Sequence, residues 1–188
     1  MSWVKATAVL IGIIGRIDPM KGHSVFLQAA ARLDSLRLRF VVVGDGPQEY
    51  RQQLAELGRS LGLDNRLVWA PGRQNVTQVY NALDICCSAS IFGEGFPNVV
   101  GEAMACGVPC VVTDVGDSAW VAGAGGLTVI PKDCNALSET LARISRLSNE
   151  ERSALGQQAR KRIIENFSVE TMVRRTEDAL EDLVRGKR

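Results

Sequence analysis

The chain has 188 residues, of which 46% are apolar and 23% are charged. This length corresponds to about one domain, and the composition argues against a disordered, collagen-like or coiled-coil chain. Lysine and arginine number 22 and aspartate and glutamate 21, so the net charge is only +1. This balance offers no bulk attraction for nucleic acid or an anionic membrane, and any bound anion must be held by a local group of residues.

The first apolar run, residues 6–15, follows Lys5 and is similar to the hydrophobic part of a signal peptide. No A-x-A cleavage site follows the run, and the run is too short to span a bilayer. Continuous apolar runs of this length are typical of buried parallel strands. We therefore expect a buried strand at about 7–14.

Apolar runs and helical patterns alternate along the rest of the chain. This alternation predicts an α/β fold, a Rossmann-like doubly wound parallel sheet with helices on both faces. Such sheets bind ligands at the carboxyl ends of their strands, so functional residues should lie in the loops that follow the strands. The predicted strands are about 7–14, 40–43, 66–69, 85–87, 108–113 and 127–130, and the predicted helices are about 22–34, 48–61, 75–82, 97–106 and several within about 133–184.

Two capping signals divide the C-terminal region. Ser148 and Glu151 have the spacing of a capping box, and Ser168 is placed to cap a further helix. These helices are long relative to the sheet that they must cover, and the chain opens almost directly into a buried strand. We therefore expect residues 1–188 to form one domain that lacks an N-terminal partner domain. The expected apolar stripes are Leu155, Ala159 and Ile163 on the first helix, and Val169, Met172, Val173, Leu180 and Val184 on the second.

The cysteines do not have the spacing of a metal site. They are odd in number, no C-x-x-C occurs, and His23 is the only histidine, so the usual zinc ligand pattern is missing. Because each lies in or beside an apolar run, we expect buried free thiols and a reducing, cytoplasmic location. The five are Cys86, Cys87, Cys106, Cys110 and Cys134.

The loop after the first strand carries two cations. Gly15 allows close approach of a ligand to the backbone. The planar guanidinium of Arg16 and the compact ammonium of Lys21 are both suited to binding a diphosphate. A solvated loop with ordinary surface cations is the alternative. For His23 a capping or packing role is favoured over a catalytic one.

A second segment, residues 90–102, precedes and opens a predicted helix. Pro97 suits the first helical position, and the free N–H groups of a helix start form an anion site. Asn98 and Glu102 lie four residues apart on one face, where Glu102 could accept hydrogen bonds from sugar hydroxyls. Glu94, just before the helix, could address a second sugar or a developing positive charge. The alternative is that both glutamates merely favour the helix start, which suits Glu94 better than Glu102.

A third segment is less informative. Residues 44–47 read Gly-Asp-Gly-Pro and match only part of a dinucleotide fingerprint, because residue 49 is Glu. A tight strand-to-helix turn is therefore the favoured interpretation. The loop at 70–74, which contains Gly72 and Arg73, could line a base pocket with its backbone.

Taken in order, these motifs resemble the C-terminal, donor-binding domain of GT-B glycosyltransferases of the large retaining family four. The resemblance rests on Gly15-Arg16 with Lys21-Gly22, on the Gly-Asp-Gly-Pro turn, and on the E-x7-E spacing from Glu94 to Glu102. It covers nearly the whole chain, and the ordered set is more specific than any one motif. It implies transfer of a hexosyl group from a nucleotide-diphosphate sugar to an acceptor hydroxyl, with retention.

The resemblance also implies roles for individual residues. Arg16 and Lys21 would bind the donor diphosphate and stabilise the leaving group, Glu94 would face the transferred sugar, and Glu102 would bind the donor ribose. No metal or cofactor is implied, and the substrate would be a UDP- or GDP-hexose. Backbone N–H groups would hold the sugar and phosphates around Gly95, Phe96, Pro97, Asn98 and Val99.

The same resemblance implies an acceptor-binding N-terminal domain that this chain lacks, so the chain alone is expected to be inactive in transfer. The longer parent could contact a membrane peripherally. A nucleotide-sugar epimerase of the same fold, a non-catalytic nucleotide-sugar-binding module and a nicotinamide-binding Rossmann domain remain alternatives. The base, the sugar, the acceptor and the oligomeric state stay open.

Overall fold

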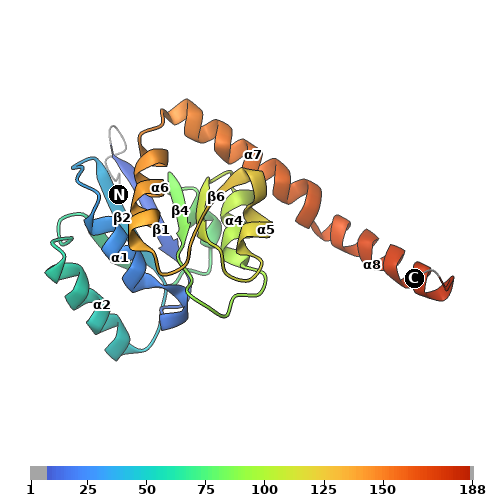
Figure 1. The fold of residues 1–188 in the computed structure, drawn as a ribbon, viewed down its shortest axis with the longest axis horizontal. Coiled ribbons are helices and arrows are strands. Elements are labelled where there is room, and N and C mark those ends of the chain that lie inside the picture. Colours follow the sequence, from blue (N-terminus) through green and yellow to red (C-terminus); the bar gives the residue numbers. More distant parts are fainter. Residues whose placement is uncertain (1–7, 187–188) are drawn as a thin grey trace.

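The computed structural model describes residues 8–186, and a six-stranded sheet lies at its centre (Figure 1). The strand order is β3-β2-β1-β4-β5-β6, and every neighbouring pair is parallel. This arrangement confirms the predicted doubly wound parallel sheet. The strands are β1 (Val9–Ile14), β2 (Leu38–Val43), β3 (Leu67–Ala70), β4 (Ile85–Ser88), β5 (Cys110–Thr113) and β6 (Gly126–Val129).

Helices cover both faces of the sheet, as predicted, and each face has its own apolar core. Helices α1, α2 and α6 pack on one face, where Phe26, Phe40 and Leu141 are fully buried. Helices α3, α4, α5 and α7 pack on the other, where Tyr80 and Met104 are buried. The helices are α1 (His23–Ala31), α2 (Gln48–Ser60), α3 (Val76–Tyr80), α4 (Asn98–Ala105), α5 (Ser118–Ala122), α6 (Cys134–Ser145), α7 (Asn149–Phe167) and α8 (Val169–Val184), with short 3₁₀ helices η1 (Pro19–Lys21) and η2 (Gly123–Gly125).

The element boundaries differ from the predicted ones in a few places. Strand β2 begins at Leu38, two residues before the predicted start, and residue 7 of the first predicted strand lies outside the described residues. Pro97 precedes α4 as its cap residue and does not occupy the first helical position. Helix α5 was not predicted, because its five residues are too few to show a helical repeat.

The two C-terminal helices are capped as predicted. The hydroxyl of Ser148 accepts a hydrogen bond from the Glu151 N–H at 3.1 Å, and the Glu151 carboxylate accepts one from the Ser148 N–H at 2.7 Å. Ala159 and Ile163 are buried where α7 packs against α4. Helix α8, capped by Ser168, extends away from the sheet (Figure 1).

The predicted apolar stripe of α8 exists but is not covered. Val169 is 67% exposed, Leu180 is 57% exposed and Val184 is 88% exposed. A helix with one such stripe usually buries it against another element. Within residues 8–186 no helix is both long and apolar enough to cross a membrane.

The five cysteines are free thiols, as predicted, but only three of the five are buried as expected. These are Cys86, Cys87 and Cys110; burial raises the pKa of Cys87, and a hydrogen bond with Cys86 followed by burial raises the pKa of Cys110, in both cases well above that of an ordinary thiol. Cys106 and Cys134 are half-buried. In the part of the chain that the structure describes, no cluster of three His, Cys, Asp or Glu side chains could hold a metal ion.

His23 is a buried packing residue. Its side chain has no exposed surface, and neither ring nitrogen makes a hydrogen bond to any described residue. Burial lowers its pKa from 6.5 to about 4, and interactions with Asp18 oppose this shift only in part. His23 therefore stays neutral in the folded chain at pH 7.

Folding stability should fall as the pH drops from about 6.5 to about 4 because of His23. Over that range the unfolded chain binds a proton at this ring and the folded chain does not, which costs about 3 kcal/mol once complete. Urea unfolding at pH 7 and pH 4.5 measures the loss for the wild type and for His23→Leu. Carboxylates titrate in both proteins, so the variant should lose about 2 kcal/mol less across this interval. Equal losses in the two proteins would contradict the assignment to His23.

Candidate functional site

The predicted site residues gather where the strand order reverses. In a sheet ordered β3-β2-β1-β4-β5-β6, chain connections from β1 and β4 leave in opposite directions, which opens a crevice at their carboxyl ends. The loop after β1 carries Arg16 and Lys21, and the loop after β4 carries Glu94. The fold therefore brings together residues that lie more than 70 positions apart.

The two loops are in direct contact. The Lys21 ammonium lies 2.5 Å from Glu94 Oε1 in an ion pair. Beside this pair, the N–H of Ile91 donates to the Met20 carbonyl at 2.8 Å. Gly22 has a φ of +67°, and a Cβ on it would lie 1.9 Å from the Ala89 carbonyl oxygen. Only glycine allows this approach, which sets the distance between the cation and the carboxylate.

Glu94 is held firmly. Its side chain is 7% exposed, and Oε1 also accepts a hydrogen bond from the Ser90 hydroxyl at 2.5 Å. The Ser90 carbonyl in turn accepts from the Thr113 hydroxyl at 2.6 Å, which ties the loop to β5. The Lys21 ammonium and the Ser90 hydroxyl both reach Oε1, so Oε2 makes no hydrogen bond within residues 8–186. Ser90 was not predicted to have a role, and only its place four residues before Glu94 could have suggested one.

The two predicted cations differ in their surroundings. Lys21 ends the short helix η1, whose start is capped by the Asp18 carboxylate, and its side chain is only 23% exposed. The Arg16 side chain is 65% exposed and lies 3.4 Å from Asp18 in a surface ion pair. Exposed pairs of this kind are weak, so Arg16 is free to turn toward an anion.

The start of α4, at Asn98, comes four residues after Glu94. The N–H groups of Asn98 and Val99 make no hydrogen bond to any described residue, as expected in the first turn of a helix. Gly15, at the end of β1, faces Val99, with an added Cβ 3.9 Å from its side chain. The positive end of the α4 dipole and these free donors are the features by which helix starts bind anions, so this helix start is a candidate anion site.

Other residues around this helix start are placed by packing. The Gly95 carbonyl accepts a hydrogen bond from the Asp117 N–H at 3.3 Å, which ties the loop between β4 and α4 to the start of α5. Phe96 packs its ring against Phe167, with centroids 5.5 Å apart, so its side chain points toward α7. Pro97 is buried, whereas Asn98 at the start of the helix is exposed.

Glu102 lies on the exposed face of α4, one turn after Asn98. The Tyr80 hydroxyl donates a hydrogen bond to Glu102 Oε2 at 2.8 Å. Tyr80 is 1% exposed, and burial followed by the Glu102 interaction raises its pKa, so it remains a neutral donor. Sequence analysis did not identify Tyr80.

The Gly-Asp-Gly-Pro segment is a tight turn that braces its neighbours. A Cβ on Gly44 would lie 1.8 Å from the Gly15 carbonyl oxygen, and the Asp45 carboxylate accepts from the Gly72 N–H at 3.0 Å. Gly72 and Arg73 are exposed in the loop after β3, at the same edge of the sheet. The turn therefore links the loops after β1, β2 and β3.

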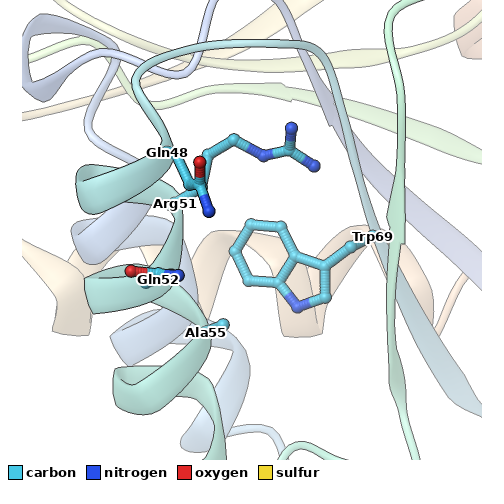
Figure 2. Close-up of a pocket in the computed structure, with 5 residues that line it drawn as sticks. All are labelled: Gln48, Arg51, Gln52, Ala55 and Trp69. Atoms are coloured by element: carbon cyan, nitrogen blue, oxygen red, sulfur yellow. The ribbon is translucent and has the colours of Figure 1, made fainter.

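A separate hollow of about 380 Å³ lies between α2 and the edge strand β3. Figure 2 shows Gln48, Arg51 and Gln52 projecting from α2 toward the indole of Trp69. None of the predicted site residues lines it. The crevice between β1 and β4 therefore remains the candidate site.

Comparisons with known proteins identify the family of the chain. The family model described as glycosyl transferases group 1 matches residues 8–146. A D-inositol 3-phosphate glycosyltransferase of Saccharomonospora viridis is 36% identical over 97% of this chain, which spans only 44% of that relative. The chain therefore covers less than half the length of this relative.

Solved structures show the same fold. Anabaena HepE in complex with UDP-glucose superposes with a TM-score of 0.84 and 25% identity, over 94% of this chain and 50% of that one. The C-terminal domain of a group 1 glycosyl transferase from Francisella tularensis superposes with a TM-score of 0.76 and 24% identity, over 86% of this chain and 87% of that domain. The sheet is thus that of a GT-B fold, and the chain belongs to the glycosyl transferases group 1 family.

Proposed function

We propose that this chain is the donor-binding half of a glycosyltransferase that moves a hexosyl group from a nucleotide-diphosphate sugar to an acceptor hydroxyl, with retention. The observation that carries the proposal is the Lys21–Glu94 pair, whose glutamate lies four residues before the free N–H groups that open α4. It combines an anion site with a carboxylate that can face a sugar. The UDP-glucose bound to HepE, which shares this fold, supports the same substrate class.

The cations and the helix start act on the diphosphate. As the bond from the anomeric carbon to the diphosphate oxygen breaks, its electron pair moves to that oxygen, while the acceptor oxygen forms the new bond to the anomeric carbon and the acceptor proton passes to the departing diphosphate. Lys21 donates one of its three N–H groups to Glu94 and has the other two for phosphate oxygens. The Arg16 guanidinium can donate two parallel hydrogen bonds to a phosphate group. The backbone N–H groups of Gly95, Phe96, Asn98 and Val99 stabilise the same charge, so the proposed step uses neither a metal nor a cofactor.

The carboxylates act on the sugars. Glu94 faces the transferred hexose, where its negative charge stabilises the positive charge that develops at the anomeric carbon. Glu102 accepts hydrogen bonds from the donor ribose, and the loop containing Gly72 and Arg73 is assigned to the uracil or guanine base. The donor is then UDP- or GDP-hexose.

The acceptor is assigned to a second domain. The matched glycosyltransferase of Saccharomonospora viridis is more than twice as long as the region shared with this chain, and the apolar face of α8 is uncovered. We infer an N-terminal domain that binds the acceptor, in a parent that works in the cytoplasm, as the free thiols suggest. The chain alone binds donor but does not transfer the sugar.

Calorimetric titration with UDP, GDP and their hexose conjugates tests the proposal. We expect micromolar to millimolar binding of one nucleotide to the chain, and about tenfold weaker binding to Glu102→Ala. Glu56→Ala, which removes an exposed glutamate from α2, should bind as the wild type does. Failure of both nucleotides to bind, or equal affinity of the Glu102 variant, would overturn the assignment.

A further inference from the structure

The hydrogen bond between Tyr80 and Glu102 joins a buried residue to an exposed one. Tyr80 is the last residue of α3 and is 1% exposed, whereas Glu102 lies on the exposed face of α4. The Tyr80 hydroxyl donates to Glu102 Oε2 at 2.8 Å, a normal length for such a bond. Within the described residues this is the only hydrogen bond of the Glu102 carboxylate, so Oε1 remains available to a ligand.

The tyrosine ring is a rigid support for that hydroxyl. It packs with Leu83, Val100 and Met104 in the apolar core on the sheet face that α3, α4, α5 and α7 cover. A tyrosine side chain has only two torsions to fix. The glutamate, in contrast, has three torsions and sits in solvent, where it samples many rotamers. A fixed donor at Oε2 therefore restricts an otherwise mobile carboxylate before any ligand arrives.

We propose that Tyr80 is a positioning residue for donor binding, whose buried hydroxyl holds the Glu102 carboxylate turned toward the ribose of the nucleotide. This inference rests on the proposed function, in which Glu102 binds the ribose. Tyr80 itself does not touch the donor. It raises affinity by lowering the entropy that Glu102 loses when the ribose hydroxyls bind.

A purely structural role makes a different prediction. If Glu102 only satisfies the tyrosine hydroxyl, loss of that hydroxyl changes stability but not the preference for a ribose with its hydroxyls. Tyr80→Phe keeps the packed ring, and water can replace the lost hydroxyl as a hydrogen-bond donor to the exposed Glu102 carboxylate. The melting temperature should therefore fall by only a few degrees. The useful readout is therefore the ratio of two ligand affinities measured on the same preparation, which an unfolded fraction does not alter.

The experiment measures Kd by calorimetry for UDP and 2′,3′-dideoxy-UDP, or for the matching guanosine pair if GDP is the nucleotide that binds. The proteins are the wild-type chain, Tyr80→Phe, Glu102→Ala and the double variant. We expect Tyr80→Phe to weaken UDP binding about three- to tenfold and to leave dideoxy-UDP binding unchanged. In the Glu102→Ala background the tyrosine substitution should have no further effect.

Each other outcome has a definite meaning. Weaker UDP binding by Glu102→Ala but not by Tyr80→Phe would overturn the positioning role and leave the proposed function standing. Equal loss for UDP and dideoxy-UDP, or the same loss with and without Glu102, would show that Tyr80 acts structurally. Wild-type affinity in Glu102→Ala, or no binding of either nucleotide to the chain, would overturn both the ribose assignment and this inference.

Discussion

Replacing Gly22 with alanine is expected to destabilise the chain by at least about 3 kcal/mol. Gly22 has a φ of +67°, a conformation that costs a non-glycine residue about 1 kcal/mol or more. A Cβ there would also lie 1.9 Å from the Ala89 carbonyl oxygen, which is backbone and cannot rotate away. The loop after β1 must therefore separate from the end of β4. Urea unfolding at pH 7 measures the loss.

Gly62→Ala is the matched control. Gly62 has a similar φ of +72°, but no atom lies within 4 Å of the added Cβ. Only the backbone strain remains, so this variant should lose about 1 kcal/mol. If the two variants lost the same amount, the close approach of the loops would not be what makes Gly22 necessary. The Gly22 variant should also bind nucleotide more weakly, because the shift separates Lys21 from Glu94.

Much of the fold follows from local patterns in the sequence. Strands such as β1 and β5 are continuous apolar runs because both faces of a parallel sheet are covered, and β1 is followed by a helical pattern. The capping box at Ser148 is equally local and was confirmed. Helix α5 was missed because a five-residue helix leaves no periodicity to detect.

Contacts between distant segments could not be predicted in this way. The Lys21–Glu94 pair exists because β1 lies next to β4, an order that no local pattern specifies. Both residues were selected from the sequence, but as separate contacts for a ligand. Tyr80 was not selected, because an aromatic residue in a short helix is expected to be part of the apolar core. Only the packing of α3 against α4 brings its hydroxyl to Glu102. The apolar stripe on α8 is a local pattern that the sequence predicts correctly, but whether another element covers that stripe is not predictable from the sequence.

The Lys21–Glu94 pair should contribute separately to folding and to donor binding. Lys21→Met leaves a carboxylate that is 7% exposed without its cation, and among residues 8–186 only the Ser90 hydroxyl then donates to it from a side chain. Removing one partner of a buried pair costs about 3 kcal/mol or more, because the other charge stays buried and uncompensated. We expect that loss in urea unfolding for Lys21→Met. The double variant Lys21→Met/Glu94→Gln should recover most of it, since no buried charge then remains.

Donor binding should not recover with stability. If Lys21 contacts the diphosphate as proposed, both Lys21 variants bind UDP or GDP at least tenfold more weakly than the wild type, whatever their stability. Lys161→Met is the control, because Lys161 pairs with Glu165 at 3.8 Å on an exposed helix face and its loss should change stability by less than about 0.5 kcal/mol. Wild-type stability in Lys21→Met would show that the pair is not a buried one in solution. Wild-type affinity in the double variant would show that Lys21 serves the loop contact alone, and the diphosphate would then have to be held by Arg16 and the start of α4.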